Sequence, residues 1–191
     1  MIVPRTPANF CAMNTQSKWL NRISSWDIQL FCWCMERNCR PLLARTGRVI
    51  SHTGDGYGYA IVAAALALSE LETRGSFYWA LALAFVIERG CYFVMKLGFR
   101  RNRPAAAIDD FNSWVQPSDQ FSFPSGHTSG AFLFSGFMEC LVPEYGSLFF
   151  GWACCVGLSR FFLGVHFITD VAMGAVMGFS LSQLTIYTLL E

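Results

Sequence analysis

The sequence has few charged residues. Only 14% of its 191 residues are charged, whereas an average soluble domain carries about 25%. The net charge is +1, with no dispersed excess of basic residues, so nothing predicts a nucleic-acid partner. Hydrophobic residues make up 53% of the chain and aromatic residues 16%, and aromatic residues concentrate at the two interfaces of a bilayer. The composition therefore favours a protein surrounded by the membrane bilayer.

The sequence also lacks the patterns of a secretory signal, a disulfide framework and a metal site. Residues 1–20 contain no apolar run and no small-residue cleavage site, both of which a signal peptide requires. The chain has eight cysteines, and Cys32, Cys34 and Cys39 form a C-x-C-x4-C cluster without a second ligand pair, unlike typical zinc sites. We therefore expect no metal ligands and no cofactor, and interpret the cysteines as small apolar residues. A metal site at this cluster is the less favoured alternative.

Five segments are apolar enough to be membrane spans: 57–71, 77–97, 128–142, 147–165 and 167–190. A span needs about 20 predominantly apolar residues, so the first and third must extend into their flanks. Lipid offers no hydrogen-bond partners to a free backbone, and all five segments should therefore be helices.

Residues 18–50 have a different pattern. Apolar residues recur there at three- or four-residue spacing, with basic and acidic residues between them: Trp19, Ile23, Trp26, Leu30 and Trp33. This predicts an amphipathic helix, broken near Pro41, that lies in the membrane interface. Ser24 and Asp27 resemble a capping box. The alternative is a helix packed on the core of a soluble protein.

The predicted fold is therefore an all-α membrane protein. About five transmembrane helices, in residues 57–190, follow the interfacial amphipathic helix of residues 18–50. No internal repeat or low-complexity tract divides the chain, so residues 1–191 are expected to form a single domain.

Three polar clusters lie at the ends of the predicted spans. They consist of Lys96, Arg103 and Pro104; of Pro124, Ser125, Gly126 and His127; and of Ser159, Arg160, His166 and Asp170. The first cluster ends the second span, the second opens the third span, and the third straddles the fourth and fifth spans. With five spans, all three clusters lie on the same side of the membrane, where they could form one site.

The residue types in these clusters are suited to binding a phosphate. Lys96, Arg103 and Arg160 supply cations, and arginine adds planar bidentate donors. Ser125 and Gly126 precede an apolar helical run, where free backbone N–H groups point toward an anion, and the Ser125 hydroxyl could add another donor. Taken alone, each residue also has a structural reading; Arg160, for example, could simply snorkel to the interface.

The two histidines of these clusters are suited to phosphoryl transfer. His166 and Asp170 are four residues apart and share a helical face, so the carboxylate could bind one imidazole nitrogen and leave the other free to attack phosphorus. His127 could protonate the leaving oxygen, while the fixed cations stabilise the charge on the transferred group. Alone, a histidine at a helix end is more often structural, and Asp170 could cap the helix or pair locally.

The three motifs Lys96-x6-Arg103-Pro104, Pro124-Ser125-Gly126-His127 and Ser159-Arg160-x5-His166-x3-Asp170 resemble the type 2 phosphatidic acid phosphatase (PAP2) superfamily, in its membrane lipid-phosphatase branch. The resemblance implies a metal-free mechanism with a phosphohistidine intermediate. It implies His166 as the nucleophile, Asp170 as its orienting partner and His127 as the general acid and then base. The implied phosphate-binding residues are Lys96, Arg103, Ser125, Gly126 and Arg160. Many membrane relatives have six spans, and this chain is expected to lack the first.

The resemblance implies a phosphorylated lipid as the substrate but does not identify it. Family members act on phosphatidic acid, phosphatidylglycerol phosphate, polyprenyl diphosphates, sphingoid phosphates or lipid A phosphates. One alternative function is phosphoryl transfer from a polyprenyl diphosphate to a lipid acceptor, and another is non-enzymatic lipid binding or transport. The short chain resembles bacterial members, which implies the bacterial cytoplasmic membrane. The oligomeric state is left open.

The charge distribution makes a prediction about sidedness. Seven basic residues outside the motifs fall on the side of the clusters: Arg5, Lys18, Arg22, Arg37, Arg40, Arg45 and Arg48. The opposite side has Arg74 with four glutamates, Glu70, Glu72, Glu144 and Glu191. The positive-inside rule therefore favours a cytoplasmic site, although bacterial relatives often face the periplasm.

Three further polar residues, Glu88, His52 and Asp55, lie outside the motifs. Glu88 shares a helical face with Tyr92 and Lys96, and because intramembrane charges usually face the bundle interior, we expect Glu88 to help hold Lys96. His52 and Asp55 flank a glycine-containing turn before the first span, and we expect them to stabilise that turn.

Overall fold

The computed structural model describes residues 18–38, 41–70, 75–117 and 119–190. The described residues form α-helices and one short 3₁₀ turn, without a named strand, which confirms the all-α prediction. The elements in chain order are α1 (Lys18–Asn38), α2 (Pro41–Thr53), α3 (Tyr57–Glu70), α4 (Gly75–Phe99), α5 (Pro104–Ala107), α6 (Gly126–Leu141), η1 (Pro143–Tyr145), α7 (Gly146–Phe162) and α8 (Ile168–Leu189).

The five apolar segments correspond to α3, α4, α6, α7 and α8. Within the described residues, α8 is the one helix whose length and hydropathy both suffice to cross a membrane. Helices α3, α6 and α7 have 14, 16 and 17 residues, and α4 contains Glu88, Arg89 and Lys96. Five crossings therefore stay a prediction from the sequence, whereas the helical nature and approximate bounds of all five segments agree with it.

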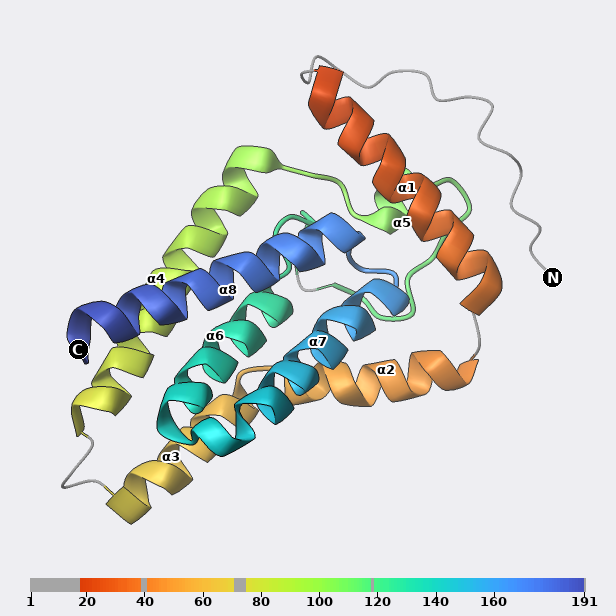
Figure 1. Ribbon diagram of the computed structural model, residues 1–191. Coiled ribbons are helices and arrows are strands. Elements are labelled where there is room, and N and C mark those ends of the chain that lie inside the picture. Colours follow the sequence, from red (N-terminus) through yellow and green to blue (C-terminus); the bar gives the residue numbers. More distant parts are fainter. Residues whose placement is uncertain (1–17, 39–40, 71–74, 118, 191) are drawn as a thin grey trace.

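Helix α6 lies at the centre of the bundle and packs against α7 and α8, while α4 packs against α8 (Figure 1). The contact between α6 and α8 depends on two glycines one turn apart, Gly174 and Gly178. A Cβ at either position would clash with a backbone carbonyl of the α6 segment, that of Ser125 or that of Ser129. Small residues allow such close backbone approach between helices in a membrane.

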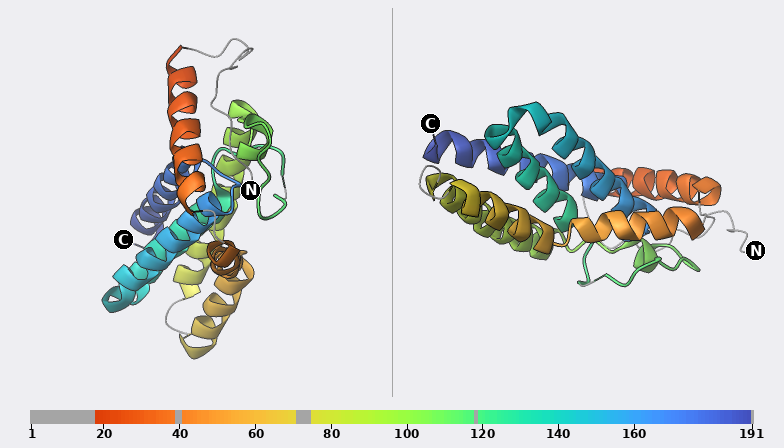
Figure 2. Two further views of the ribbon diagram at one scale, coloured as in Figure 1. Left: turned by 90° about the vertical axis from the view of Figure 1, so that its right-hand side faces the viewer. Right: turned by 90° about the horizontal axis from the view of Figure 1, so that it is seen from below.

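The segment 18–50 contains two helices: α1 ends at Asn38, and α2 runs from Pro41 to Thr53. Helices α1 and α2 occupy one end of the molecule and α3 the other (Figure 2). The predicted capping box at Ser24 and Asp27 is wrong, because α1 begins at Lys18 and Asp27 lies in mid-helix. Local spacing suggested a cap where tertiary contacts instead bury the carboxylate.

Helix α1 has one face against the bundle and another exposed. Phe31 and Met35 are buried in a cluster with Phe161 and Phe167 from the α7–α8 region, and the Phe31 ring makes edge-to-face contacts with both phenylalanines. The exposed face carries Trp26, Leu30 and Trp33. The side chains of Trp19 and Ile23 lie outside the described residues. The exposed aromatic face is compatible with an interfacial position.

Candidate active site

The end of α4, the start of α6 and the junction of α7 and α8 meet around a cavity of about 680 Å³, within the range typical of ligand sites. Its polar end is lined by Arg103, Asp119, His127, Arg160 and His166. Its apolar part extends between α3 and α4, where the lining includes Tyr59, Ala60, Tyr78, Leu81 and Phe85. One cavity therefore combines a cationic end with an apolar extension.

His166 lies in the short connection between α7 and α8. Gly164, with a φ of +76°, gives the turn that a side chain would disfavour. The His166 side chain is buried, and Nε2 lies 3.5 Å from Nη1 of Arg103. Burial lowers the pKa of His166 to about 4, and the positive charges of Arg103 and Arg160 act in the same direction. The imidazole is therefore neutral at neutral pH, as a nucleophile must be.

Asp170 lies at the first turn of α8, behind His166. Its Oδ2 is 3.7 Å from Nδ1 of His166, longer than a hydrogen bond, and Nδ1 has no hydrogen-bond partner in the described part of the chain. The carboxylate instead accepts hydrogen bonds from the Phe167 backbone N–H at 2.8 Å and from Nη1 of Arg101 at 2.7 Å. Asp170 is therefore fixed and faces the imidazole without a hydrogen bond to it.

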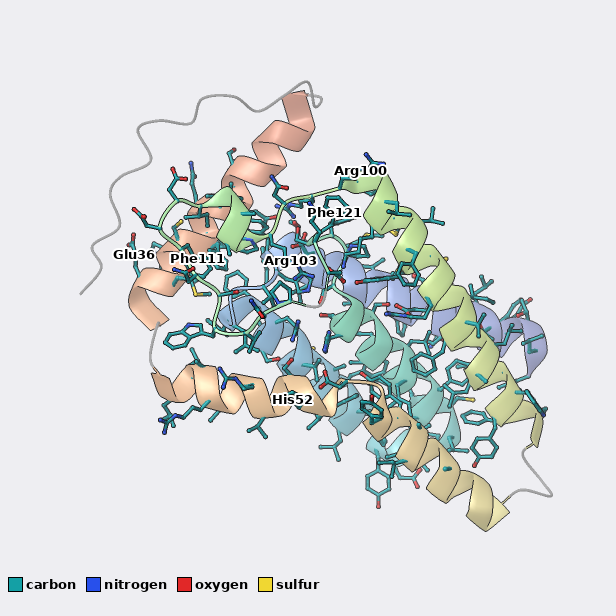
Figure 3. The ribbon with its side chains drawn as sticks, turned by 180° about the vertical axis from the view of Figure 1, so that it is seen from behind. Glu36, His52, Arg100, Arg103, Phe111 and Phe121 are labelled. Carbon is teal, nitrogen blue, oxygen red and sulfur yellow. The ribbon has the colours of Figure 1, made fainter. Side chains whose placement is uncertain are left out.

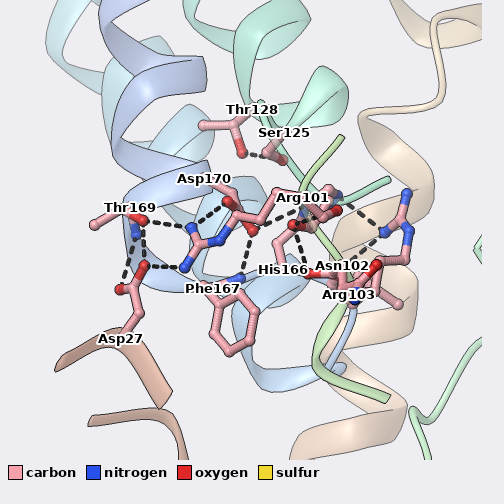
Figure 4. Close-up of polar contacts among 12 residues, drawn as sticks. Asp27, Arg101, Asn102, Arg103, Ser125, Thr128, His166, Phe167, Thr169 and Asp170 are labelled. Atoms are coloured by element: carbon pink, nitrogen blue, oxygen red, sulfur yellow. Dashed lines mark hydrogen bonds and ion pairs between the residues drawn. The ribbon is translucent and has the colours of Figure 1, made fainter. Parts of the chain in front are cut away.

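Arg101 connects α1 to this carboxylate, as Figure 4 shows. Its Nη1 donates to Thr169 and Asp170, both at 2.7 Å, and its Nη2 donates to Asp27 at 2.6 Å. Arg101 is not among the predicted site residues, because the first motif specifies only Lys96 and Arg103 and leaves the intervening positions open. The available sequence signal for Arg101 was the pair of consecutive arginines, Arg100 and Arg101, between Lys96 and Arg103.

Lys96 and Arg103 converge on a carboxylate that the sequence analysis did not identify. The Lys96 ammonium donates to Oδ2 of Asp119 at 2.7 Å and also contacts the Tyr92 hydroxyl. Arg103 forms an ion pair with Oδ1 of the same carboxylate and donates from Nε to its backbone carbonyl at 3.0 Å. Figure 3 shows Arg103 among the side chains enclosed by the helices. Two predicted phosphate ligands are thus held by an internal anion.

Asp119 is ionised in this arrangement. Burial acts to raise its pKa, but hydrogen bonds from Lys96, Tyr92 and Arg103 outweigh burial and hold the pKa well below its usual range. Asp119 lies within the connection between α5 and α6, and no motif or periodicity in the sequence distinguishes it from Asp109 and Asp110.

Arg160 has a hydrogen-bond donor available for a substrate anion. Its Nη1 donates to the Ser51 hydroxyl at 2.6 Å, while the buried Nε has no hydrogen-bond partner among the described residues. Arg160 lines the cavity together with His127 and His166. A buried guanidinium with an unused N–H is suited to binding an incoming anion.

The structure places Ser125 and Gly126 differently. Gly126 lines the cavity at the start of α6, and a Cβ there would lie 2.8 Å from the Tyr92 ring. Ser125 is fully buried, its hydroxyl shares a 2.8 Å hydrogen bond with Thr128, and its N–H donates to the Asp170 carbonyl. The Ser125 hydroxyl therefore forms its hydrogen bond within the first turn of α6, and Ser125 does not line the cavity.

His127 forms a hydrogen bond with a second carboxylate that lines the cavity, that of Asp55. Its Nε2 lies 2.7 Å from Oδ1 of Asp55, and Oδ2 of Asp55 lies 2.6 Å from Nδ1 of His52. The contact with His52 fits the predicted role in the turn, but the contact with His127 was not predicted. Asp55 and His127 are 72 residues apart, so no local pattern could indicate the pair.

Glu88 does not hold Lys96, contrary to prediction. The fully buried Glu88 carboxylate pairs with Arg89 at 2.6 Å and accepts a hydrogen bond from the Ser129 hydroxyl. Lys96 lies two turns further along α4, where Asp119 is its acidic partner. A shared helical face made the contact possible, but Glu88 binds Arg89 in the same helix and Ser129 in α6, and Lys96 binds Asp119.

Comparison with known proteins gives consistent results. The sequence model of the PAP2 superfamily matches residues 77–191. The chain is 33% identical over 149 residues to a decaprenylphosphoryl-5-phosphoribose phosphatase of Mycobacterium tuberculosis, covering 73% of this chain and 76% of that protein.

Two solved structures have the same fold. The PAP2-type phosphatidylglycerolphosphate phosphatase of Bacillus subtilis aligns with a TM-score of 0.72 and 26% identity, covering 86% of this chain and 85% of that one. LpxE of Aquifex aeolicus aligns with a TM-score of 0.71 and 27% identity, covering 84% of this chain and 94% of that one.

Proposed function

The chain belongs to the PAP2 superfamily and is a membrane lipid phosphatase; from this premise we propose that it hydrolyses a lipid phosphate or diphosphate through a phosphohistidine on His166. The observation that carries the proposal is the shared polar end of the cavity. There the neutral, buried His166 lies beside Arg103, with Arg160 and His127 lining the same space. This arrangement supplies a nucleophile, a proton donor and cations around one phosphate.

In the first step, Nε2 of His166 attacks phosphorus, and the bond from phosphorus to the lipid oxygen breaks. His127 gives its proton to that oxygen as the lipid leaves. Asp170 faces Nδ1 and stabilises the positive charge that develops on His166. In the second step His127 takes a proton from water, the resulting hydroxide attacks phosphorus, and phosphate and free His166 are released.

Phosphate binding requires the Asp119 carboxylate to leave the Lys96 and Arg103 side chains. Lys96 and Arg103 are the two cations supplied by the first motif, and both bind the Asp119 carboxylate in the structure. A phosphate dianion carries more charge than a carboxylate and offers more acceptor oxygens, so it can replace Asp119 on these cations. Arg160 then adds its Nε–H, which has no hydrogen-bond partner among the residues that the structure describes.

The apolar part of the cavity accounts for a lipid substrate. Tyr59, Leu81 and Phe85 belong to the wall between α3 and α4, next to surfaces that five membrane-spanning helices would expose to lipid. Phosphatidic acid, phosphatidylglycerol phosphate, polyprenyl diphosphate and lipid A are the candidate classes, because all of them join a phosphate to long apolar chains. The names of the bacterial relatives support this range.

We place the chain in the bacterial cytoplasmic membrane with its site facing the cytoplasm. The exposed Arg45 and Arg48 belong to α2, the helix whose Ser51 binds Arg160 of the site, and basic residues on the side of the site favour a cytoplasmic orientation by the positive-inside rule. A single cysteine at position 109 in an otherwise cysteine-free chain tests this orientation. Labelling by an impermeant maleimide only after the cells are opened is expected, whereas labelling in intact spheroplasts would place the site outside.

The test of the function is phosphate release by the detergent-purified protein in the presence of EDTA, with a panel of the four lipid classes. We expect release to survive EDTA, His127→Ala to lower kcat by about 10²- to 10⁴-fold, and His166→Ala to reduce release to the buffer level. An acid-labile phosphate trapped on the protein, and absent from His166→Ala, identifies the intermediate. Activity that EDTA abolishes, or that His166→Ala retains, would contradict the mechanism.

A further inference from the structure

His52 and His127 both contact the carboxylate of Asp55, and His127 and His166 both line the cavity. Asp55, in the bend between α2 and α3, places one oxygen 2.7 Å from Nε2 of His127 and the other 2.6 Å from Nδ1 of His52. The exposure of the side chains increases along this series, from 27% for His127 and 32% for Asp55 to 71% for His52. The series therefore runs from the cavity to the surface.

We propose that Asp55 is a positioning residue for the acid–base histidine, holding the His127 ring in one tautomer and stabilising its protonated form. The inference rests on the proposed function, in which His127 donates a proton to the leaving lipid. Asp55 holds a proton on Nε2, so Nδ1 is the nitrogen that exchanges a proton with the leaving oxygen and then with water. Each catalytic histidine then has its own carboxylate, Asp170 for His166 and Asp55 for His127.

The charges around His127 explain why a carboxylate is needed there. Burial lowers the pKa of His127 to about 4, and the positive charges of Arg160 from α7 and Arg89 from α4 act in the same direction, whereas the hydrogen bond with Asp55 and its negative charge act to raise the pKa. Arg89 is partly neutralised by Glu88, whereas Arg160 is paired only with the neutral Ser51 hydroxyl among the described residues. Without Asp55, an imidazolium in this position would face two guanidinium groups with no acidic partner, and the pKa of His127 would fall further.

His52 and the backbone keep Asp55 in place. The second oxygen of Asp55 is occupied by His52, and the Asp55 N–H donates to the His52 carbonyl at 3.1 Å. Burial acts to raise the pKa of Asp55, but its hydrogen bonds with His52 and His127 lower the pKa, so the carboxylate stays charged. A charged acceptor forms a stronger hydrogen bond with an imidazolium than a neutral one does.

The experiment compares Asp55→Asn, Asp55→Glu and His52→Gln with the wild-type enzyme, with Asp109→Asn as an exposed control from the same end of the molecule. We expect Asp55→Asn to lower kcat by about 10- to 100-fold, the size of the effect seen when a metal-binding histidine loses its orienting carboxylate, with KM within about threefold. The alkaline limb of kcat/KM should move down by about 1 pH unit, the effect of losing an opposite charge at this distance. Asp55→Glu should recover part of both, and the Asp109→Asn control should match wild type.

A second measurement does not depend on activity. The NMR titration of ¹⁵N-labelled histidine, assigned with His127→Ala, should give a lower pKa for His127 in Asp55→Asn than in wild type. An unchanged pH limb and an unchanged titration would overturn the inference. If those results came together with inactive His127→Ala and His166→Ala variants, the proposed function would stand. Full activity of His127→Ala would refute the proposed function itself.

Discussion

Substitution of Asp119 by asparagine should make the enzyme bind phosphate more tightly. In the structure the Asp119 carboxylate forms ion pairs with Lys96, at 2.7 Å, and with Arg103. Substrate phosphate must displace this carboxylate from both cations. Asparagine has nearly the same size but no charge, so the two cations become available to an incoming anion. The same change removes the partners of two buried cations and should lower the stability of the substrate-free protein.

The magnitude follows from the contacts that are lost. A hydrogen bond to a charged group contributes about 1.5–3 kcal/mol, but the Asp119 side chain is one-third exposed and regains hydration when displaced, which reduces the figure toward that of a surface pair. A net difference of roughly 1–2 kcal/mol is left, equivalent to about 5- to 30-fold in affinity.

Product inhibition by inorganic phosphate measures this directly. The inhibition constant for phosphate should fall by about tenfold in Asp119→Asn and stay unchanged in Asp109→Asn, whose carboxylate is exposed. Added phosphate should also raise the unfolding temperature of Asp119→Asn more than that of wild type, because tighter binding to the native state stabilises it more. A higher inhibition constant would refute the reasoning, since it would mean that Asp119 positions the cations for phosphate and does not compete with it.

Three further outcomes are expected, each measured by unfolding in detergent. Arg101→Leu should lower the free energy of unfolding by about 3–5 kcal/mol, because it leaves the buried carboxylates of Asp27 and Asp170 without their cation. Arg100→Gln, which changes an exposed side chain, should have little effect. Equal stability of the two variants would contradict the contact between Arg101 and α1. Gly178→Ala should cost about 1–3 kcal/mol through overpacking against α6, and Gly151→Ala, which meets open space, should be neutral. Burial lowers the pKa of His166 from 6.5 to about 4, so the unfolded chain binds more protons between these values. His166 should therefore lower the stability by up to about 3 kcal/mol as the pH falls through this window. His166→Gln should reduce that slope without abolishing it, because burial also lowers the pKa of His127 to about 4.

The structure also changes the interpretation of the segment before the bundle. Residues 18–50 were expected to form an interfacial helix, and the exposed Trp26 and Trp33 are consistent with that position. The opposite face of α1, however, buries Phe31 and places Asp27 on Arg101, next to the Asp170 carboxylate. Helix α1 is therefore a support of the site as well as a candidate membrane anchor.

The sequence determined which segments are helical and which residues have the chemistry for the site. Apolar runs of limited length, bounded by polar clusters, give the bounds of α4, α6, α7 and α8 to within a few residues, because helix formation and lipid exposure act on neighbouring residues. The motif spacing also indicated that Arg103, His127, Arg160 and His166 belong together, and the structure brings them to one cavity. Their catalytic roles stay predictions that the substitutions above test.

Only the tertiary structure decided which charged groups face one another. Asp119 on Lys96 and Arg103, Asp55 on His127, and Arg101 between Asp27 and Asp170 join residues that are 16 to 74 positions apart. Ser125 had the right sequence position for a phosphate ligand, yet its hydroxyl turned to Thr128 inside the bundle. Spacing along a helix fixes the direction of a side chain, but its partner depends on which helix packs opposite, and that depends on burial summed over the whole chain.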